Sequence, residues 1–150
     1  MGKKETYIQL ISILLIALWV YTAASKLMEV ELFRFQLTQQ PIFKSWIPVL
    51  VRALPIIELI TAGLLMFAKT RPAGMRLTFL LIAVFTGYVA LAVVGFWENI
   101  PCSCGGVLNQ LGWRDHLWFN LFFTALAAAG VYLSRSIHRK DGLKQVAFSG

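Results

Sequence analysis

Four long apolar segments constrain the fold of this chain more than any other feature of its sequence. They lie at about residues 7–24, 46–68, 77–97 and 117–133. Each has about 17 to 23 residues, and about 20 apolar residues in a helix cross the hydrocarbon core of a bilayer. We therefore predict an all-α integral membrane domain with four spans. It would occupy residues 1–134, and residues 135–150 would form a basic tail.

The composition agrees with this class. The chain has 150 residues, of which 58% are hydrophobic and only 14% are charged. Soluble domains contain about 25% charged residues. The length leaves no room for a separate soluble enzyme module beside four spans.

The distribution of basic residues predicts the orientation. Four spans place both termini on one side, and that side would carry nine basic residues: Lys3, Lys4, Lys69, Arg71, Arg76, Arg135, Arg139, Lys140 and Lys144. The opposite side would carry four: Lys26, Arg34, Lys44 and Arg114. The positive-inside rule then puts both termini in the cytoplasm, and the last loop faces the periplasm of a bacterial inner membrane. Because the net charge of +7 is explained by topology and the basic residues are scattered, we expect no nucleic-acid partner.

The chain has two cysteines, Cys102 and Cys104, and both lie in this outward loop. A disulfide between them closes a small ring that reaches normal geometry only with a bent backbone, so we expect it to be strained. Strained, exposed disulfides are more oxidising and are the labile or catalytic kind. Gly105 and Gly106 follow the pair and let the backbone bend. The pattern favours a redox-active pair, and hence a thiol–disulfide oxidoreductase.

Three other interpretations of the cysteine pair stay open. A static disulfide is one, although closing so short a loop restrains the unfolded chain very little. A pair of inert thiols is another, although an oxidising compartment does not favour free thiols. Capture of a soft metal such as Cu(I) by two thiolates is the third. That loop contains no further Cys or Met ligand, and His116 is its sole imidazole.

The second span carries the other candidate site residues. Glu58 lies about 12 residues after Trp46, which is about 18 Å deep in a helix and near the bilayer midplane. An ionisable group at that depth usually faces the bundle interior with a partner. Arg52 can extend outward or turn inward, and Lys26 ends the first span at the same surface. We expect Lys26, Arg52 and Glu58 to form a cluster that tunes the thiols or binds an electron acceptor, or else Glu58 serves only helix packing.

The connections between spans also carry expectations. Residues 29–35 alternate charged and apolar side chains and predict a short amphipathic helix on the membrane, with Leu32, Phe33, Phe35 and Leu37 on one broad face. Pro72 and Gly74 are typical turn residues for a tight cytoplasmic hairpin. Asp115 is a suitable N-cap for the fourth span.

Three short elements, in this order on four spans, carry a family resemblance. Residues 25–27 read Ser-Lys-Leu, residues 54–58 contain Pro-x-x-Glu, and residues 102–105 contain C-x-C followed by Gly. The chain resembles the MauE/DoxX-like family of redox-associated membrane proteins over about residues 8–133. The resemblance implies an all-α integral membrane four-helix bundle related to the DoxX and vitamin K epoxide reductase architectures. It also implies a role in electron delivery or removal for disulfides of periplasmic proteins.

A single dithiol site limits the mechanism. The chain has no cysteine on the cytoplasmic side for a transmembrane thiol relay, so electrons from Cys102 and Cys104 must pass to a quinone in the bilayer or to a thioredoxin-like partner. His116 would either move protons or sit idle at a helix start. The rival interpretation is a non-catalytic accessory subunit of a larger membrane complex, in which the first and third spans bind partner helices.

Overall fold

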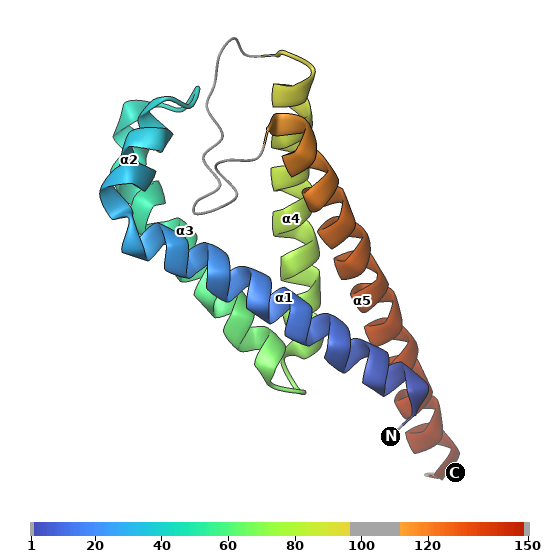
Figure 1. The fold of residues 1–150 in the computed structure, drawn as a ribbon. Coiled ribbons are helices and arrows are strands. Elements are labelled where there is room, and N and C mark those ends of the chain that lie inside the picture. The colour runs from blue at the N-terminus through green and yellow to red at the C-terminus, as the bar shows by residue number, and fades with distance from the viewer. Residues whose placement is uncertain (1, 97–111, 149–150) are drawn as a thin grey trace.

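The computed structural model describes residues 2–96 and 112–148, and within these ranges every regular element is helical (Figure 1). The elements are α1 (Lys3–Met28), α2 (Val30–Thr38), the 3-10 helix η1 (Lys44–Trp46), α3 (Ile47–Met66), α4 (Arg71–Val93) and α5 (Trp113–Phe148). Four segments are long and apolar enough to cross a membrane: Lys3–Met28, Lys44–Met66, Arg71–Val93 and Arg114–Ile137. For the described residues, the prediction of an all-helical fold with four helices long and apolar enough to span a membrane is confirmed.

The helices extend past the apolar segments that predicted them. α1 begins four residues before the first apolar segment and ends four residues after it. α5 has 36 residues and continues through most of the predicted tail. Helical hydrogen bonding does not stop where hydrophobicity stops, because Lys, Arg and Glu are also good helix formers.

Two predictions about the connections are wrong in detail. The turn between α3 and α4 lies at residues 67–70, where Thr70 donates its hydroxyl to the carbonyl of Leu64 at 2.8 Å. Pro72 and Gly74 lie inside the first turns of α4, because proline fits a helix start that needs no backbone donor. Asp115 lies in the first turn of α5, which begins at Trp113, and so does not cap it.

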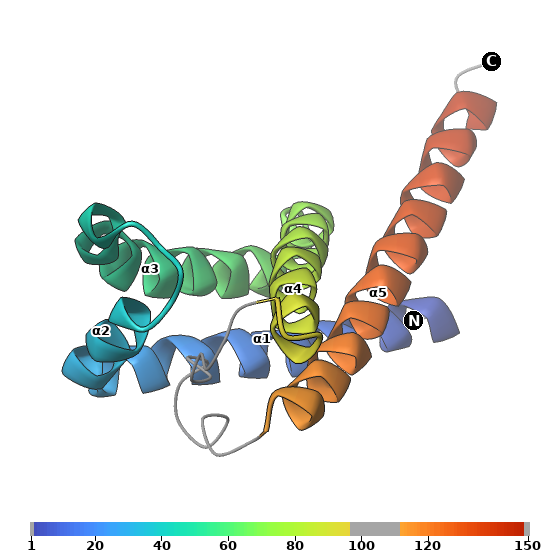
Figure 2. The same cartoon turned by 90° about the horizontal axis from the view of Figure 1, so that it is seen from above.

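The spans form two packed pairs. α1 packs most extensively on α3, and α4 packs most extensively on α5 (Figures 1 and 2). Both termini lie at one end of the bundle, where the Lys4 ammonium donates to the Ser136 hydroxyl at 3.1 Å (Figure 1). The end of α4 and the start of α5 lie at the other end, as do α2 and the end of α1 (Figure 1).

One apolar core joins all four spans. Its buried members come from α1, α3, α4 and α5: Ile11, Leu15, Trp19, Ala62, Leu65, Met75, Ile82 and Ala127. Two buried polar contacts add links between the helices. The Trp19 indole donates to the Thr78 hydroxyl at 3.1 Å, and the hydroxyls of Thr86 and Thr124 lie 2.9 Å apart. Such side-chain hydrogen bonds hold transmembrane helices together by about 1 kcal/mol each.

The short helix α2 packs on the first half of α3. Phe33 and Leu37 of α2 form a second core with Ile47 and Val51 of α3. The predicted helix is present, but its apolar residues divide between two faces, since Leu32 and Phe35 are exposed. Their spacing explains the division. Phe33 and Leu37 are four residues apart and share a face, whereas Phe35 lies about 200° around the helix from Phe33.

Candidate functional site

A buried ion pair joins the end of α1 to the middle of α3. The ammonium of Lys26 lies 2.7 Å from Glu58 Oε1, and both residues are less than a tenth exposed. The same ammonium donates to the carbonyl of Thr22 at 3.2 Å. It also lies 5.7 Å from the ring centroid of Phe33, so that α2 covers the pair. The cation is held by three kinds of partner and is fixed in position.

Arg52 does not join this pair. Its side chain is exposed, and among the residues described no ion pair includes it. The reason lies in helix geometry, because six residues at about 100° each place Arg52 and Glu58 about 240° apart around α3. The structure therefore brings together two of the three residues of the expected cluster, and it leaves Arg52 on the outer surface of the bundle.

A cavity of about 440 Å³ opens beside the ion pair. Side chains from α1 through α5 line it, and most of them are apolar. Its aromatic members are Trp19, Phe33, Phe85, Tyr88, Phe119 and Phe123. At the rim, Tyr88 of α4 donates its hydroxyl to Gln40, which follows α2 and also lines the cavity.

Three polar residues that line this cavity have buried side-chain atoms without a hydrogen-bond partner in the described part of the chain. They are Glu58 through Oε2, His116 through both ring nitrogens, and Asn120 through Nδ2. Within the described residues none of these atoms has a hydrogen-bond partner, although each atom is buried. His116 and Asn120 are four residues apart on α5 and so share one helical face. Buried polar atoms in native proteins are nearly always bonded, so these atoms point to a bound ligand or ordered water.

The side chain of His116 is 1% exposed and packs among rings. The ring of Phe85 meets it edge-on at 5.9 Å between centroids, and the ring of Phe119 stacks on it at 6.4 Å. The sequence placed His116 at a helix start but not in a cavity. Asn120 was not singled out from the sequence. The available signal was a lone amide in an apolar span, one helical turn from the histidine.

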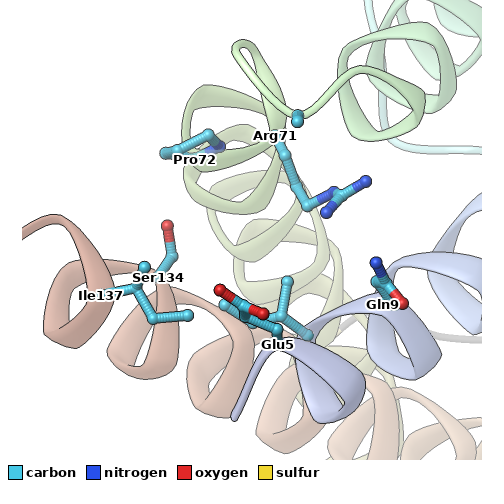
Figure 3. Close-up of a pocket in the computed structure, with 8 residues that line it drawn as sticks. Glu5, Gln9, Arg71, Pro72, Ser134 and Ile137 are labelled. Carbon is cyan, nitrogen blue, oxygen red and sulfur yellow. The ribbon is translucent and has the colours of Figure 1, made fainter. Parts of the chain in front are cut away.

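A second hollow lies at the opposite end of the bundle. It measures about 270 Å³ between the starts of α1 and α4 and the middle of α5, and Figure 3 shows Glu5, Arg71 and Ser134 around it. Both of its charged side chains already have partners: Glu5 accepts from the backbone of Gly2 at 3.1 Å, and Arg71 donates to the carbonyl of Leu65 at 3.3 Å. None of the unbonded atoms of the larger cavity belongs to it. The larger cavity is therefore the better candidate for a binding site.

The two cysteines lie outside the described residues. The chain leaves α4 through Gly95, whose positive φ of 76° suits glycine, and it re-enters the described part at Gly112 before α5. Among the residues described, no three His, Cys, Asp or Glu side chains gather closely enough to hold a metal ion.

The fold and the site together define a multi-pass helical membrane protein with a cavity among its spans. The sequence model of the family described as methylamine utilisation protein MauE matches residues 4–133. The chain therefore belongs to the MauE family, as its three short elements predicted. Neither the comparison with curated proteins nor the comparison with solved structures found a match. The expected likeness to DoxX and vitamin K epoxide reductase bundles stays a prediction.

Proposed function

We propose that this protein is a membrane thiol–disulfide redox protein of a bacterial inner membrane. Its Cys102–Cys104 pair would face the periplasm and exchange electrons with a thioredoxin-like or disulfide-containing protein. The observation that carries the proposal is that a MauE-family membrane protein has two cysteines, both placed two residues apart in one connection between spans. The family description, methylamine utilisation protein, gives the metabolic setting.

In the proposed reaction, a thiolate of the partner attacks one sulfur of the Cys102–Cys104 disulfide. A mixed disulfide forms and the other cysteine leaves as a thiolate. A second thiolate of the partner then breaks the mixed disulfide, so the partner gains a disulfide and this protein holds two thiols. The two electrons and two protons must next pass to an acceptor, because the chain contains no other cysteine.

The two helices that flank the cysteines in the sequence support a connection between this chemistry and the cavity. The helix before them, α4, ends at Val93, and the helix after them, α5, begins at Trp113. Tyr88 near the end of α4 and His116 near the start of α5 both line the cavity.

The ion pair changes the role expected of Lys26. An isolated cation near the cysteines would favour the thiolate form. Lys26, however, lies 2.7 Å from a carboxylate oxygen of Glu58, so the pair contributes little net positive potential. Arg52 lies on the outer surface and offers none inside the bundle. Lys26 and Glu58 are better suited to hold an uncharged acceptor than to activate a thiol.

Trapping of the mixed disulfide tests the proposal. In cells that express the Cys102→Ser or the Cys104→Ser variant, the remaining cysteine can form a mixed disulfide with the partner. The neighbouring cysteine that would break this mixed disulfide is missing. We expect one of the two variants to accumulate a disulfide-linked adduct with a periplasmic protein after thiols are blocked with a maleimide. The adduct should disappear on reduction and should be absent from the double variant.

The same experiment decides against the rival role of an accessory subunit. If both single variants trap nothing and support growth on methylamine as the parent does, the redox proposal is wrong. The cysteine pair would then form only a local structural disulfide, and the spans would serve only to bind other subunits.

A further inference from the structure

We propose that the cavity between the spans binds an uncharged, lipid-soluble aromatic ring that carries oxygen substituents, of the quinone or hydroquinone class. The inference rests on the proposed function for its biological meaning, because it names the acceptor of the two electrons. The binding site itself follows from described residues alone and includes neither cysteine.

The size and lining of the cavity select a flat apolar molecule. Its volume of about 440 Å³ falls within the range of about 300–1,000 Å³ that is usual for small-molecule sites. Six aromatic side chains line it, and rings in such surroundings stack face to face or edge to face. A planar ring fits this lining better than a flexible acyl chain, which makes no such directed contacts.

The unbonded polar atoms select the oxygen substituents. The amide nitrogen of Asn120 donates, a carboxylate oxygen of Glu58 accepts, and a neutral imidazole at His116 offers one donor and one acceptor. A quinone carbonyl would accept from Asn120 or His116. A hydroquinone hydroxyl would donate to Glu58 or His116. Both oxidation states of the ring can therefore satisfy these atoms.

The ion pair selects against charged ligands. Because Lys26 and Glu58 neutralise each other at 2.7 Å, the cavity has no net charge with which to hold a phosphate or a carboxylate. An anionic head group would also meet Glu58 Oε2, which no described residue bonds. Desolvation of an unpaired charge would add a further cost.

The rim of the cavity provides a route from the bilayer. Ile57 of α3 and Leu80 and Val84 of α4 line the cavity, yet they are 37%, 60% and 70% exposed. These residues lie on two membrane-spanning helices, so the surface that they share with the cavity faces lipid. A ring with an isoprenoid or alkyl tail can enter here and leave its tail between α3 and α4.

The electron balance agrees with this class of ligand. Oxidation of the Cys102–Cys104 dithiol to a disulfide releases two electrons and two protons. A quinone that accepts two electrons and two protons becomes a hydroquinone. No further oxidant or reductant is needed for this step.

Binding to the purified full-length protein in lipid nanodiscs tests the inference. The probe is a benzoquinone with a short alkyl tail, and the readout is saturable quenching of tryptophan fluorescence, since Trp19 lines the cavity. A photoreactive azido form of the same ring should crosslink to α4 between residues 80 and 88 and to α5 between residues 116 and 123. Saturable binding with crosslinks at these positions supports the site. Crosslinks only elsewhere overturn it.

Variants identify the polar contacts. Asn120→Leu and His116→Phe keep the approximate size of the side chains but remove their hydrogen-bonding atoms. Loss of one buried hydrogen bond weakens binding by about tenfold, which we expect for each variant. The matched control is Ser134→Ala, a buried polar position further along α5 that does not line this cavity, and its affinity should equal that of the parent.

A ligand without oxygen substituents completes the test. A benzene ring with the same alkyl tail should bind at least tenfold more weakly than the quinone, because it leaves the three polar residues unbonded. Equal affinity for both rings overturns the inference, since the cavity would then be a nonspecific apolar hollow whose polar atoms are bonded by water.

The inference and the proposed function can fail separately. The variant with both Cys102→Ser and Cys104→Ser should bind the quinone with the affinity of the parent. If the ring binds but the single cysteine variants trap no partner, the redox function is wrong and the site stands. If partners are trapped but no ring binds, the site is wrong and electrons leave through another protein.

Discussion

At the scale of single residues, the Lys26–Glu58 pair is the most constrained feature of the bundle. A carboxylate and an ammonium inside a membrane-spanning domain are each costly, and mutual contact is what makes them tolerable. One carboxylate oxygen bonds the ammonium at 2.7 Å, whereas the other is buried without a hydrogen-bond partner among the described residues, in a side chain that lines the cavity. The pair therefore has two consequences, a link between α1 and α3 and a polar group available to a ligand.

The stability of variants at this pair measures the link. Lys26→Met leaves Glu58 buried without a counter-charge, so we expect it to lower the free energy of unfolding in detergent by about 3 kcal/mol. Adding Glu58→Gln removes the stranded charge and should restore most of that loss. Thermal unfolding followed by circular dichroism provides the measurement. Equal stability of the single and double variants would show that the two side chains are not coupled.

The exposed pair on α2 is the control for this measurement. Arg34 and Glu31 lie 4.0 Å apart with side chains that are 51% and 87% exposed. Exposed pairs contribute about 0–1 kcal/mol, so Arg34→Gln should change the stability little.

The sequence predicted the inward partner of Glu58 but not the outward direction of Arg52. Depth in the membrane was enough to require a partner for a carboxylate, and the nearest cation at the end of the first span was Lys26. The direction of the Arg52 side chain depends on its angle around α3 relative to the face that packs on α1. The sequence alone does not show which face of α3 that is. Asn120 was missed because its meaning depends on Glu58, which is 62 residues away in the sequence and lines the same cavity from another helix.

At the scale of elements, the contact of α3 with α4 depends on Gly74. A Cβ atom at this position would lie 3.0 Å from the carbonyl carbon of Leu64 and 3.0 Å from the backbone nitrogen of Leu65. Real Cβ atoms seldom approach backbone so closely, and backbone atoms cannot move aside as a flexible side chain can. The absence of a side chain is thus what lets α4 start against the end of α3.

Replacement of this glycine should separate the two helices. We expect Gly74→Ala to lower the stability by about 1–3 kcal/mol, because the added methyl group overpacks a backbone contact. Gly87→Ala is the matched control within the same helix, since a Cβ there meets nothing within 4 Å. Detergent-induced unfolding of both variants checks the difference. An equal effect at the two positions would contradict a close approach at Gly74.

The helices themselves were predictable, whereas their ends were not. Each span was recognisable as a run of about 20 apolar residues. In a bilayer, such a segment has few possible structures other than a helix. The hairpin was misjudged because Pro and Gly were interpreted as turn residues. In the structure Pro72 starts α4, and Gly74 allows a close contact with a helix that precedes it. Only the packing of α4 on α3 distinguishes these roles.

At the scale of the whole molecule, the two helix pairs meet near the termini and leave room at the other end. The shared core occupies the first part of α1, the end of α3 and the start of α4, with Leu15, Leu65 and Met75 fully buried. At the opposite end α1 and α3 lean away from α4 and α5, and α2 covers part of the space (Figure 1). The cavity and the ends of the connection that carries the cysteines lie in this wider half.

The proposed chemistry requires that the wide end of the bundle faces the periplasm. Labelling of residues at the two ends of α3 can show on which side of the membrane each end lies. Ser45 and Ala68 flank this helix, both are exposed, and its 20 residues separate its ends by about 30 Å. In a chain with both native cysteines replaced by serine, Ser45→Cys should react with a membrane-impermeant maleimide in spheroplasts. Ala68→Cys should react only after permeabilisation, because the positive-inside rule predicts a cytoplasmic location for the side that carries nine basic residues. The reverse pattern would place the cysteine pair in a reducing compartment. A disulfide would not persist there, and the proposed exchange with periplasmic proteins would be impossible.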